Sequence, residues 1–289
     1  MHSAGKALRL AGQQIADWPH KSLFWLGLLL NLNFSLAPVT NMVSAARALG
    51  NPLQIFEPYL LMSSYVHTCF LWMIGLIVFL SDAPFLDERI TYIGLRVGRR
   101  EWVAAQLLYV SAGCVFYALA RLVFSLLLTA PYAYAGDLWS PTMMAIANNE
   151  RDLAQQLGLY FPNVYMLSYY QPYAFLGVTV LLQTLYCLAI GMLIFGLNLL
   201  FSKGVGTTVA LCAHNLGFFI LLDGHIFANQ RWSLMVHALP CYHGAYGLMT
   251  WLPTIGESLI LFAGIIAVMA AVCVIRARSI DFSVPFRNL

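Results

Sequence analysis

Charged residues are scarce in this sequence. Only 9% of its 289 residues are Asp, Glu, Lys or Arg, whereas 61% are hydrophobic. Soluble domains contain about 25% charged and about 45–50% apolar residues, so the composition excludes an ordinary soluble domain. The mean hydropathy of +0.75 points the same way. We therefore expect a polytopic membrane protein that contacts the lipid bilayer along most of its surface.

Motifs for catalysis, nucleotide binding and metal binding are also lacking. The stretch GVGTT at 204–208 has neither the lysine nor the preceding strand of a phosphate-binding loop, and no HExxH or GxSxG occurs. The six cysteines form no CxxC, and the seven histidines have no two-ligand helical spacing. The chain is thus predicted to hydrolyse no ATP, to hold no metal or cofactor, and not to be an enzyme by itself. No basic run outside one loop suggests nucleic acid.

Long apolar runs are abundant, and a run of about 20 residues is long enough to cross a bilayer as a helix. Six such runs are present: 23–43, 59–80, 103–129, 173–201, 205–222 and 255–275. The fold class is therefore predicted to be all-α, with a leader over 1–22 and a six-span transmembrane domain over 23–289. Leader residues Ala4, Ala7, Leu8, Ala11, Ile15 and Trp18 recur at helical spacing. They predict a helix lying in the membrane interface, the alternative being a frayed tail.

The basic residues are distributed asymmetrically between the loops. Eleven Lys and Arg fall on the side of the termini (6, 9, 21, 89, 96, 99, 100, 203, 276, 278 and 287), and three fall on the other side (47, 151 and 231). Because short basic loops stay in the cytoplasm, both termini are predicted to be cytoplasmic, in a plasma (inner) membrane.

The loop at 81–102 holds eight charged residues between two apolar runs. Within it, Leu86, Ile90, Ile93 and Val97 form one apolar stripe at helical spacing. Asp82 can cap the start of this helix, and Gly98 can end it. We expect a short amphipathic helix that lies on lipid, stabilises the ends of the spans or docks into another protein.

This loop, FLDERITYIGLRVGRREWVAAQLL, together with the order of parts, resembles the permease subunits of ABC-2 type (type V exporter-like) ABC transporters. The matching positions are Leu86, Asp87, Glu88, Arg89, Leu95, Arg96, Arg99, Arg100, Trp102 and Gln106. The resemblance implies a coupling helix that contacts a cytoplasmic ABC ATPase through Leu86, Asp87, Glu88, Arg89, Ile93, Arg96, Arg99 and Arg100. It also implies ATP and Mg²⁺ on that partner, and a second permease copy or a sibling permease. Export of an amphipathic peptide, lipid or drug-like molecule by alternating access would follow.

Two outer segments are predicted. The segment at 131–172, with several of the seven tyrosines between 132 and 173, is longer than in the smallest permeases of this kind. The segment at 223–253 is broken at Pro240 and Gly244, which predicts a re-entrant hairpin before the sixth span or, alternatively, a loop on the lipid surface. The second cytoplasmic loop is reduced to SKG, which puts a second docking element in doubt.

Polar residues inside the apolar runs are candidates for a substrate path. They are His67, Tyr117, Arg121, Ser125 and His214. Tyr117, Arg121 and Ser125 share one helical face, which either lines an exit path for an anionic or zwitterionic molecule or lets Arg121 snorkel to the headgroups. Each histidine either contacts substrate or bonds a neighbouring helix. A membrane-embedded enzyme using His67 or His214 remains an alternative function, as does a noncatalytic scaffold or immunity protein.

Overall fold

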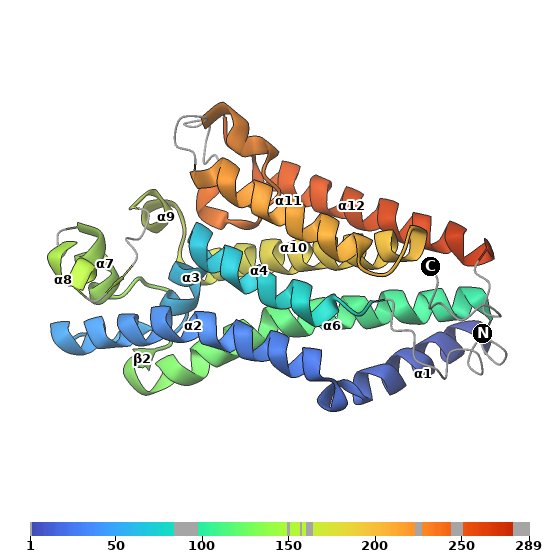
Figure 1. Cartoon of the computed structure of the whole chain (residues 1–289). Coiled ribbons are helices and arrows are strands. Elements are labelled where there is room, and N and C mark those ends of the chain that lie inside the picture. Colours follow the sequence, from blue (N-terminus) through green and yellow to red (C-terminus); the bar gives the residue numbers. More distant parts are fainter. Residues whose placement is uncertain are drawn as a thin grey trace.

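The computed structural model describes residues 2–83, 98–148, 151–156, 158–159, 164–222, 227–243 and 251–279. Within these residues the chain is helical apart from turns, loops and one pair of two-residue strands. The long helices lie side by side in an elongated bundle (Figure 1).

Among the described residues, five helices are long and apolar enough to cross a membrane. They are α2 (Ser22–Leu49), α6 (Arg99–Thr129), α10 (Pro172–Leu200), α11 (Val205–Leu222) and α12 (Ile255–Arg276). Local sequence sets their ends: Gly50 follows α2 with a φ of 68°, and Thr254 and Glu257 form a capping box at the start of α12. The prediction of an all-α polytopic membrane protein is therefore confirmed.

The second predicted span is broken. Helix α3 (Glu57–Ser63) meets α4 (Val66–Leu80) at an angle of 87°. Helix α4 alone is about 22 Å long at 1.5 Å per residue, which is shorter than the roughly 30 Å of a hydrocarbon core. The total is six spans only if α3 and α4 count as one, so the number six stays a prediction.

The leader is a helix, α1 (His2–Ala16), followed by a 3-10 turn, η1 (Trp18–His20). Its buried residues Ala7, Leu10 and Ala11 belong to the main core cluster, and α1 packs along the first half of α6. Leu8, which was predicted to lie on the apolar face of this helix, is 61% exposed. The helical prediction is confirmed, but α1 turns its buried face toward α6, because α6 begins at Arg99 and offers a protein surface there.

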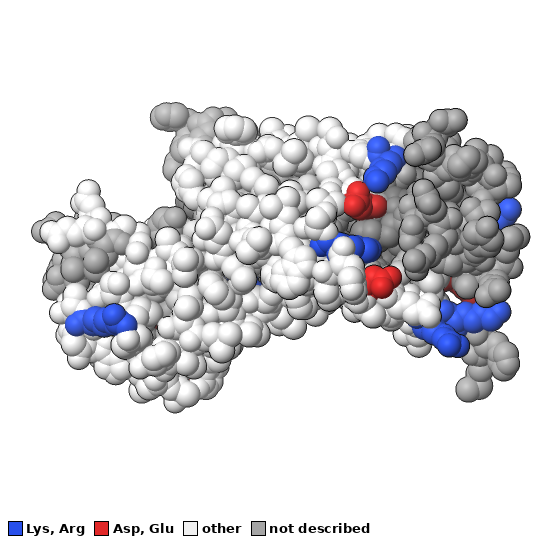
Figure 2. Space-filling model, turned by 60° about the horizontal axis from the view of Figure 1, so that its bottom comes forward, with Lys and Arg blue, Asp and Glu red and all other residues white. Residues whose placement is uncertain are grey.

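Charge is gathered at the end of the bundle where α1, the start of α6 and the end of α12 lie (Figure 1). Figure 2 shows acidic and basic side chains near this end, a long uncharged stretch, and a separate basic group at the other end. Lys203 pairs with Asp82 at 3.2 Å, and Arg99 donates to the carbonyl of Arg278 at 3.1 Å. We call this the basic end; it is defined by Lys6, Arg9, Lys21, Arg99, Arg100, Lys203, Arg276 and Arg278.

The opposite end carries the segment predicted at 131–172. It contains η2 (Ala130–Tyr132), β2 (Ala133–Tyr134), α7 (Pro141–Asn148), α8 (Arg151–Gln156) and α9 (Val164–Tyr169), and β2 pairs in parallel with β1 (Leu53–Gln54). Hydrogen bonds of Glu57 connect this segment to α3. Its buried carboxylate accepts hydrogen bonds from the Ser140 amide at 2.5 Å, the Ser140 hydroxyl at 2.6 Å and the Gln54 amide at 3.1 Å.

The predicted hairpin at 223–253 is described over 227–243 and 251–253. It forms three short 3-10 turns, η3 (Phe227–Trp232), η4 (Val236–Ala238) and η5 (Pro240–Tyr242), of which η4 contacts α10 and α12. Ser258 of α12 lies between two imidazoles: His237 Nδ1 is 2.8 Å and His243 Nε2 is 2.9 Å from its Oγ. This cluster ties the segment to the bundle, while a re-entrant course stays a prediction.

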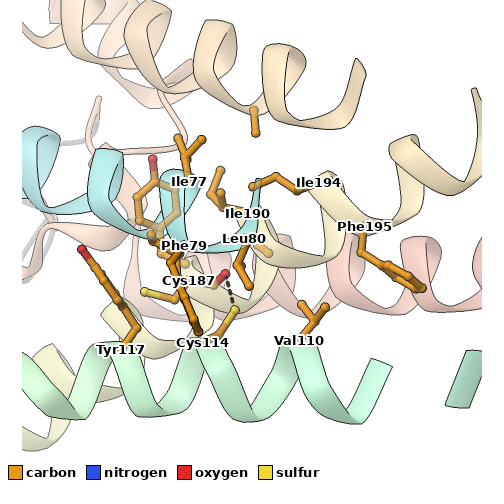
Figure 3. Close-up of a cluster of buried hydrophobic side chains, with 14 of the residues drawn as sticks. Ile77, Phe79, Leu80, Val110, Cys114, Tyr117, Cys187, Ile190, Ile194 and Phe195 are labelled. Carbon is orange, nitrogen blue, oxygen red and sulfur yellow. Dashed lines mark hydrogen bonds between the residues drawn. The ribbon is translucent and has the colours of Figure 1, made fainter. Parts of the chain in front are cut away.

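The core of the bundle lies between α4, α6 and α10. Figure 3 shows apolar side chains of these helices pointing toward one another, among them Phe79, Val110 and Ile190. Cys114 donates to the carbonyl of Cys187 at 3.1 Å, and a Cβ on Gly191 would come within 2.6 Å of the Cys114 sulfur. The helices therefore approach closely through small residues, the usual mode of helix association in lipid.

Candidate functional site

The three predicted path residues of α6 face the interior. Tyr117, Arg121 and Ser125 are 2%, 0% and 0% exposed. Of the two alternatives for Arg121, snorkelling does not fit this burial: its side chain turns toward the break between α3 and α4, where protein groups surround it. Tyr117 donates from Oη to the carbonyl of Trp72 at 2.7 Å.

The break between α3 and α4 supplies the other wall of the site. Arg121 Nη2 donates to the carbonyl of Met62 at 3.4 Å, and the guanidinium carbon lies 5.1 Å from the centre of the Trp72 ring. On the facing helix α10, Gln183 donates to the carbonyl of Ser63 at 3.2 Å and accepts from the Tyr59 hydroxyl at 3.2 Å. Neither Trp72 nor Gln183 was predicted, although a glutamine within an apolar run is a usable signal.

Several buried polar groups at and beside this site have no hydrogen-bond partner. Four of these atoms can donate, namely Nε and Nη1 of Arg121, Nε1 of Trp72 and the hydroxyl of Ser125, and the Ser63 hydroxyl and the Asn31 amide oxygen are also without a partner. Among the described residues no Asp or Glu forms an ion pair with Arg121. A buried charge without a counter-ion is costly, so the burial of Arg121 needs a physical reason.

His214 is structural in this arrangement. Its Nδ1 lies 2.8 Å from the Tyr186 hydroxyl and its Nε2 lies 3.0 Å from the carbonyl of Phe70, whose ring stacks on the imidazole at 5.0 Å. Both ring nitrogens are thus engaged in bonds from α11 to α10 and α4. This agrees with the alternative that the histidine bonds a neighbouring helix.

His67 lies apart from the site. Its side chain is exposed on the outside of the bundle, where its ring meets the Phe218 ring edge-on at 5.4 Å. The structure therefore does not bring His67 together with Arg121 and Ser125.

Most of the predicted ATPase-coupling residues lie outside the described residues, namely Leu86, Asp87, Glu88, Arg89, Ile93 and Arg96. Arg99 and Arg100 are described, and they form the first turn of α6 rather than the end of a loop helix. Gly98 is the N-cap of α6, so this helix begins ahead of the predicted apolar run at 103–129, while the bounds of the loop at 81–102 stay a prediction.

Two further arrangements bear on chemistry in the described part of the chain. No group of three His, Cys, Asp or Glu side chains is placed to hold a metal ion there. The Ser258 hydroxyl between His237 and His243 has the partners of an activated nucleophile, but it is fully buried. Compared with protein-family models, with curated proteins and with solved structures, the chain gives no match.

Proposed function

We propose that this chain is the membrane-spanning permease subunit of an ATP-driven exporter. The observation that carries the proposal is the broken helix α3–α4 packed around the buried, unpaired Arg121. Discontinuous helices with irregular backbone in the bundle interior are typical of substrate sites in transporters, and a buried ionisable residue in a membrane helix is a functional candidate by default.

The assignment to an ATP-driven class rests on the resemblance of the 81–102 loop. In this proposal α3 and α4 form one broken span, the total is six, and the basic end is cytoplasmic, as expected in a plasma (inner) membrane. Two permeases face each other, each with its loop helix on an ATPase. The 223–253 segment is a re-entrant hairpin at the outer surface.

At the basic end, hydrogen bonds hold the start of this loop against the bundle. Asn198 at the end of α10 donates to the carbonyl of Ala83 at 2.5 Å, and its Oδ1 accepts the amides of Gly204 at 3.1 Å and Gly206 at 2.7 Å. Ala83, near the start of the loop at 81–102, is therefore bonded to the α10–α11 turn, so a push on the loop would reach the bundle through hydrogen bonds. An enzyme using His214 is less favoured, because both of its ring nitrogens are engaged.

Co-purification tests the proposal. The chain is tagged in its native cell and isolated with its partners, in parallel with a variant in which Asp87, Glu88 and Arg89 are changed to alanine. We expect an ABC ATPase with the wild type and at least about tenfold less with the triple variant, because charge-assisted contacts at a docked surface would be lost. The control is Lys6→Ala, which removes an exposed charge from the same end. Absence of any ATPase from the wild-type preparation would refute the proposal.

A further inference from the structure

The Arg121 site has the donor pattern of an anion-binding site. A guanidinium carries five N–H donors, and here only one nitrogen, Nη2, has an acceptor, at the long distance of 3.4 Å. Together with the partnerless Trp72 Nε1 and Ser125 hydroxyl, the site holds four buried donor atoms without an acceptor. A carboxylate or phosphate supplies two or more acceptor oxygens and a negative charge, which is what the site lacks.

A structural role for Arg121 would be to neutralise the carbonyl end of the broken helix α3. The last four carbonyls of α3, however, all have another donor. Those of Leu60 and Leu61 accept the hydroxyl and the amide of Ser64, that of Met62 accepts the Thr68 hydroxyl, and that of Ser63 accepts Gln183. The carbonyl end of helix α3 therefore does not need Arg121 as a hydrogen-bond donor, and capping of α3 does not explain the buried guanidinium.

We infer that the buried face of α6 at Arg121 binds the anionic head of an amphiphilic cargo, with Arg121, Ser125 and Trp72 as its donors. The chemical class follows from the surroundings. The positive charge favours an anionic carboxylate or phosphate head, and the planar guanidinium of Arg121 can bind two of its oxygens at once. The side chains of Trp72, Tyr59 and Tyr117 are aromatic and buried, and they suit the apolar part next to the head. This inference rests on the proposed function, because it names the molecule that the permease would carry.

The test is ligand-dependent thermal unfolding of the purified full-length chain in nanodiscs of phosphatidylcholine. Four probes share a twelve-carbon tail: dodecanoate, dodecyl phosphate, dodecyl maltoside and dodecyltrimethylammonium. We expect the two anionic probes to raise the Tm of the wild type more than the neutral and cationic ones do. Arg121→Met should abolish this difference. Arg121→Lys should weaken binding of dodecyl phosphate by at least about tenfold, because lysine cannot form the bidentate hydrogen bonds of a guanidinium.

Variants without ligand separate the two roles of Arg121. If it is an unpaired charge awaiting a ligand, Arg121→Met leaves the ligand-free Tm unchanged or raises it, since an uncompensated buried charge disappears. A lower ligand-free Tm for Arg121→Met, with equal shifts for anionic and neutral probes in the wild type, would overturn the inference. The control Arg47→Met removes the exposed arginine that stacks on Tyr132, and should keep the preference for anionic probes.

An anionic membrane lipid presents the same head chemistry as a cargo. Nanodiscs of phosphatidylglycerol distinguish the two: if they alone give the Arg121-dependent rise and dodecanoate adds nothing, the occupant is a bilayer lipid and the assignment to cargo is refuted. None of these measurements needs an ATPase. A failed co-purification with an intact anion preference therefore refutes only the proposed function, and the converse result refutes only the anion site.

Discussion

The contact between α4 and α6 allows a quantitative prediction at Gly75. A Cβ at this position would lie 2.2 Å from the Tyr117 hydroxyl oxygen, 3.1 Å from the Gly27 carbonyl oxygen and 3.2 Å from Leu30 Cβ. In Gly75→Ala the hydroxyl must therefore move and give up its bond to the Trp72 carbonyl. Overpacking costs about 1–3 kcal/mol and the lost hydrogen bond about 1 kcal/mol, so we expect the free energy of unfolding to fall by about 2–4 kcal/mol.

A double-mutant cycle isolates this clash. Tyr117→Phe alone removes the hydrogen bond and should cost about 1 kcal/mol. In the double variant the oxygen that meets the new Cβ is gone, and the remaining contacts with Gly27 and Leu30 need shifts of only a few tenths of an ångström. The double variant should thus lie within about 1 kcal/mol of Tyr117→Phe, with a coupling energy of at least about 1 kcal/mol.

The assay is unfolding of the purified chain in mixed micelles with increasing sodium dodecyl sulfate, followed by circular dichroism. Gly264→Ala on α12 is the matched control, because a Cβ there has no other heavy atom within 4 Å and the stability should not fall. Additive losses in the double variant, or a Gly75→Ala protein as stable as the wild type, would show that Tyr117 does not occupy the space beside Gly75.

Three further predictions concern the other polar contacts. Glu57→Ala leaves the Ser140 and Gln54 donors unpaired and should lower the free energy of unfolding by about 3–5 kcal/mol, measured in the same micelles, whereas Ser140→Ala, which keeps the backbone donor, should cost less. His214→Phe should cost about 2 kcal/mol, because two bonds between helices disappear; an unchanged stability would contradict them. Burial lowers the pKa of His243 to about 4 and also lowers the pKa of His237, which Arg231 and Glu257 face. Between pH 4 and about 6.5 the unfolded chain therefore binds more protons than the folded chain, and the Tm should fall as the pH drops through this range. His243→Gln should flatten this dependence.

Composition and run length predict the spans well where the helices are straight. The predicted runs 173–201 and 205–222 nearly coincide with α10 and α11, because an uninterrupted apolar stretch has no alternative to a helix in lipid. The run at 59–80 conceals the break in the second span. Ser64 and Thr68 could have signalled it, since their hydroxyls bond nearby carbonyls and so satisfy a helix end, but such residues also occur in straight helices.

The direction of a polar side chain was not predictable from the sequence. Arg121 sits about 18 residues into the third apolar run, so its depth suited snorkelling, and only the position of α3 and α4 places protein in front of it. His214 and His67 differ for the same reason. Both are single histidines in apolar runs, yet one is enclosed by Tyr186 and Phe70 and the other faces outward.

The right angle between α3 and α4 also has a mechanical consequence. A displacement of α4 along its own axis has almost no component along the axis of α3, so α3 would sweep sideways, across its own axis. Glu57, in the first turn of α3, holds Ser140 through two hydrogen bonds, and the sweep would therefore carry the start of α7 with it. Motion that enters α4 at the basic end would therefore reach the segment at the opposite end through α3 and Glu57.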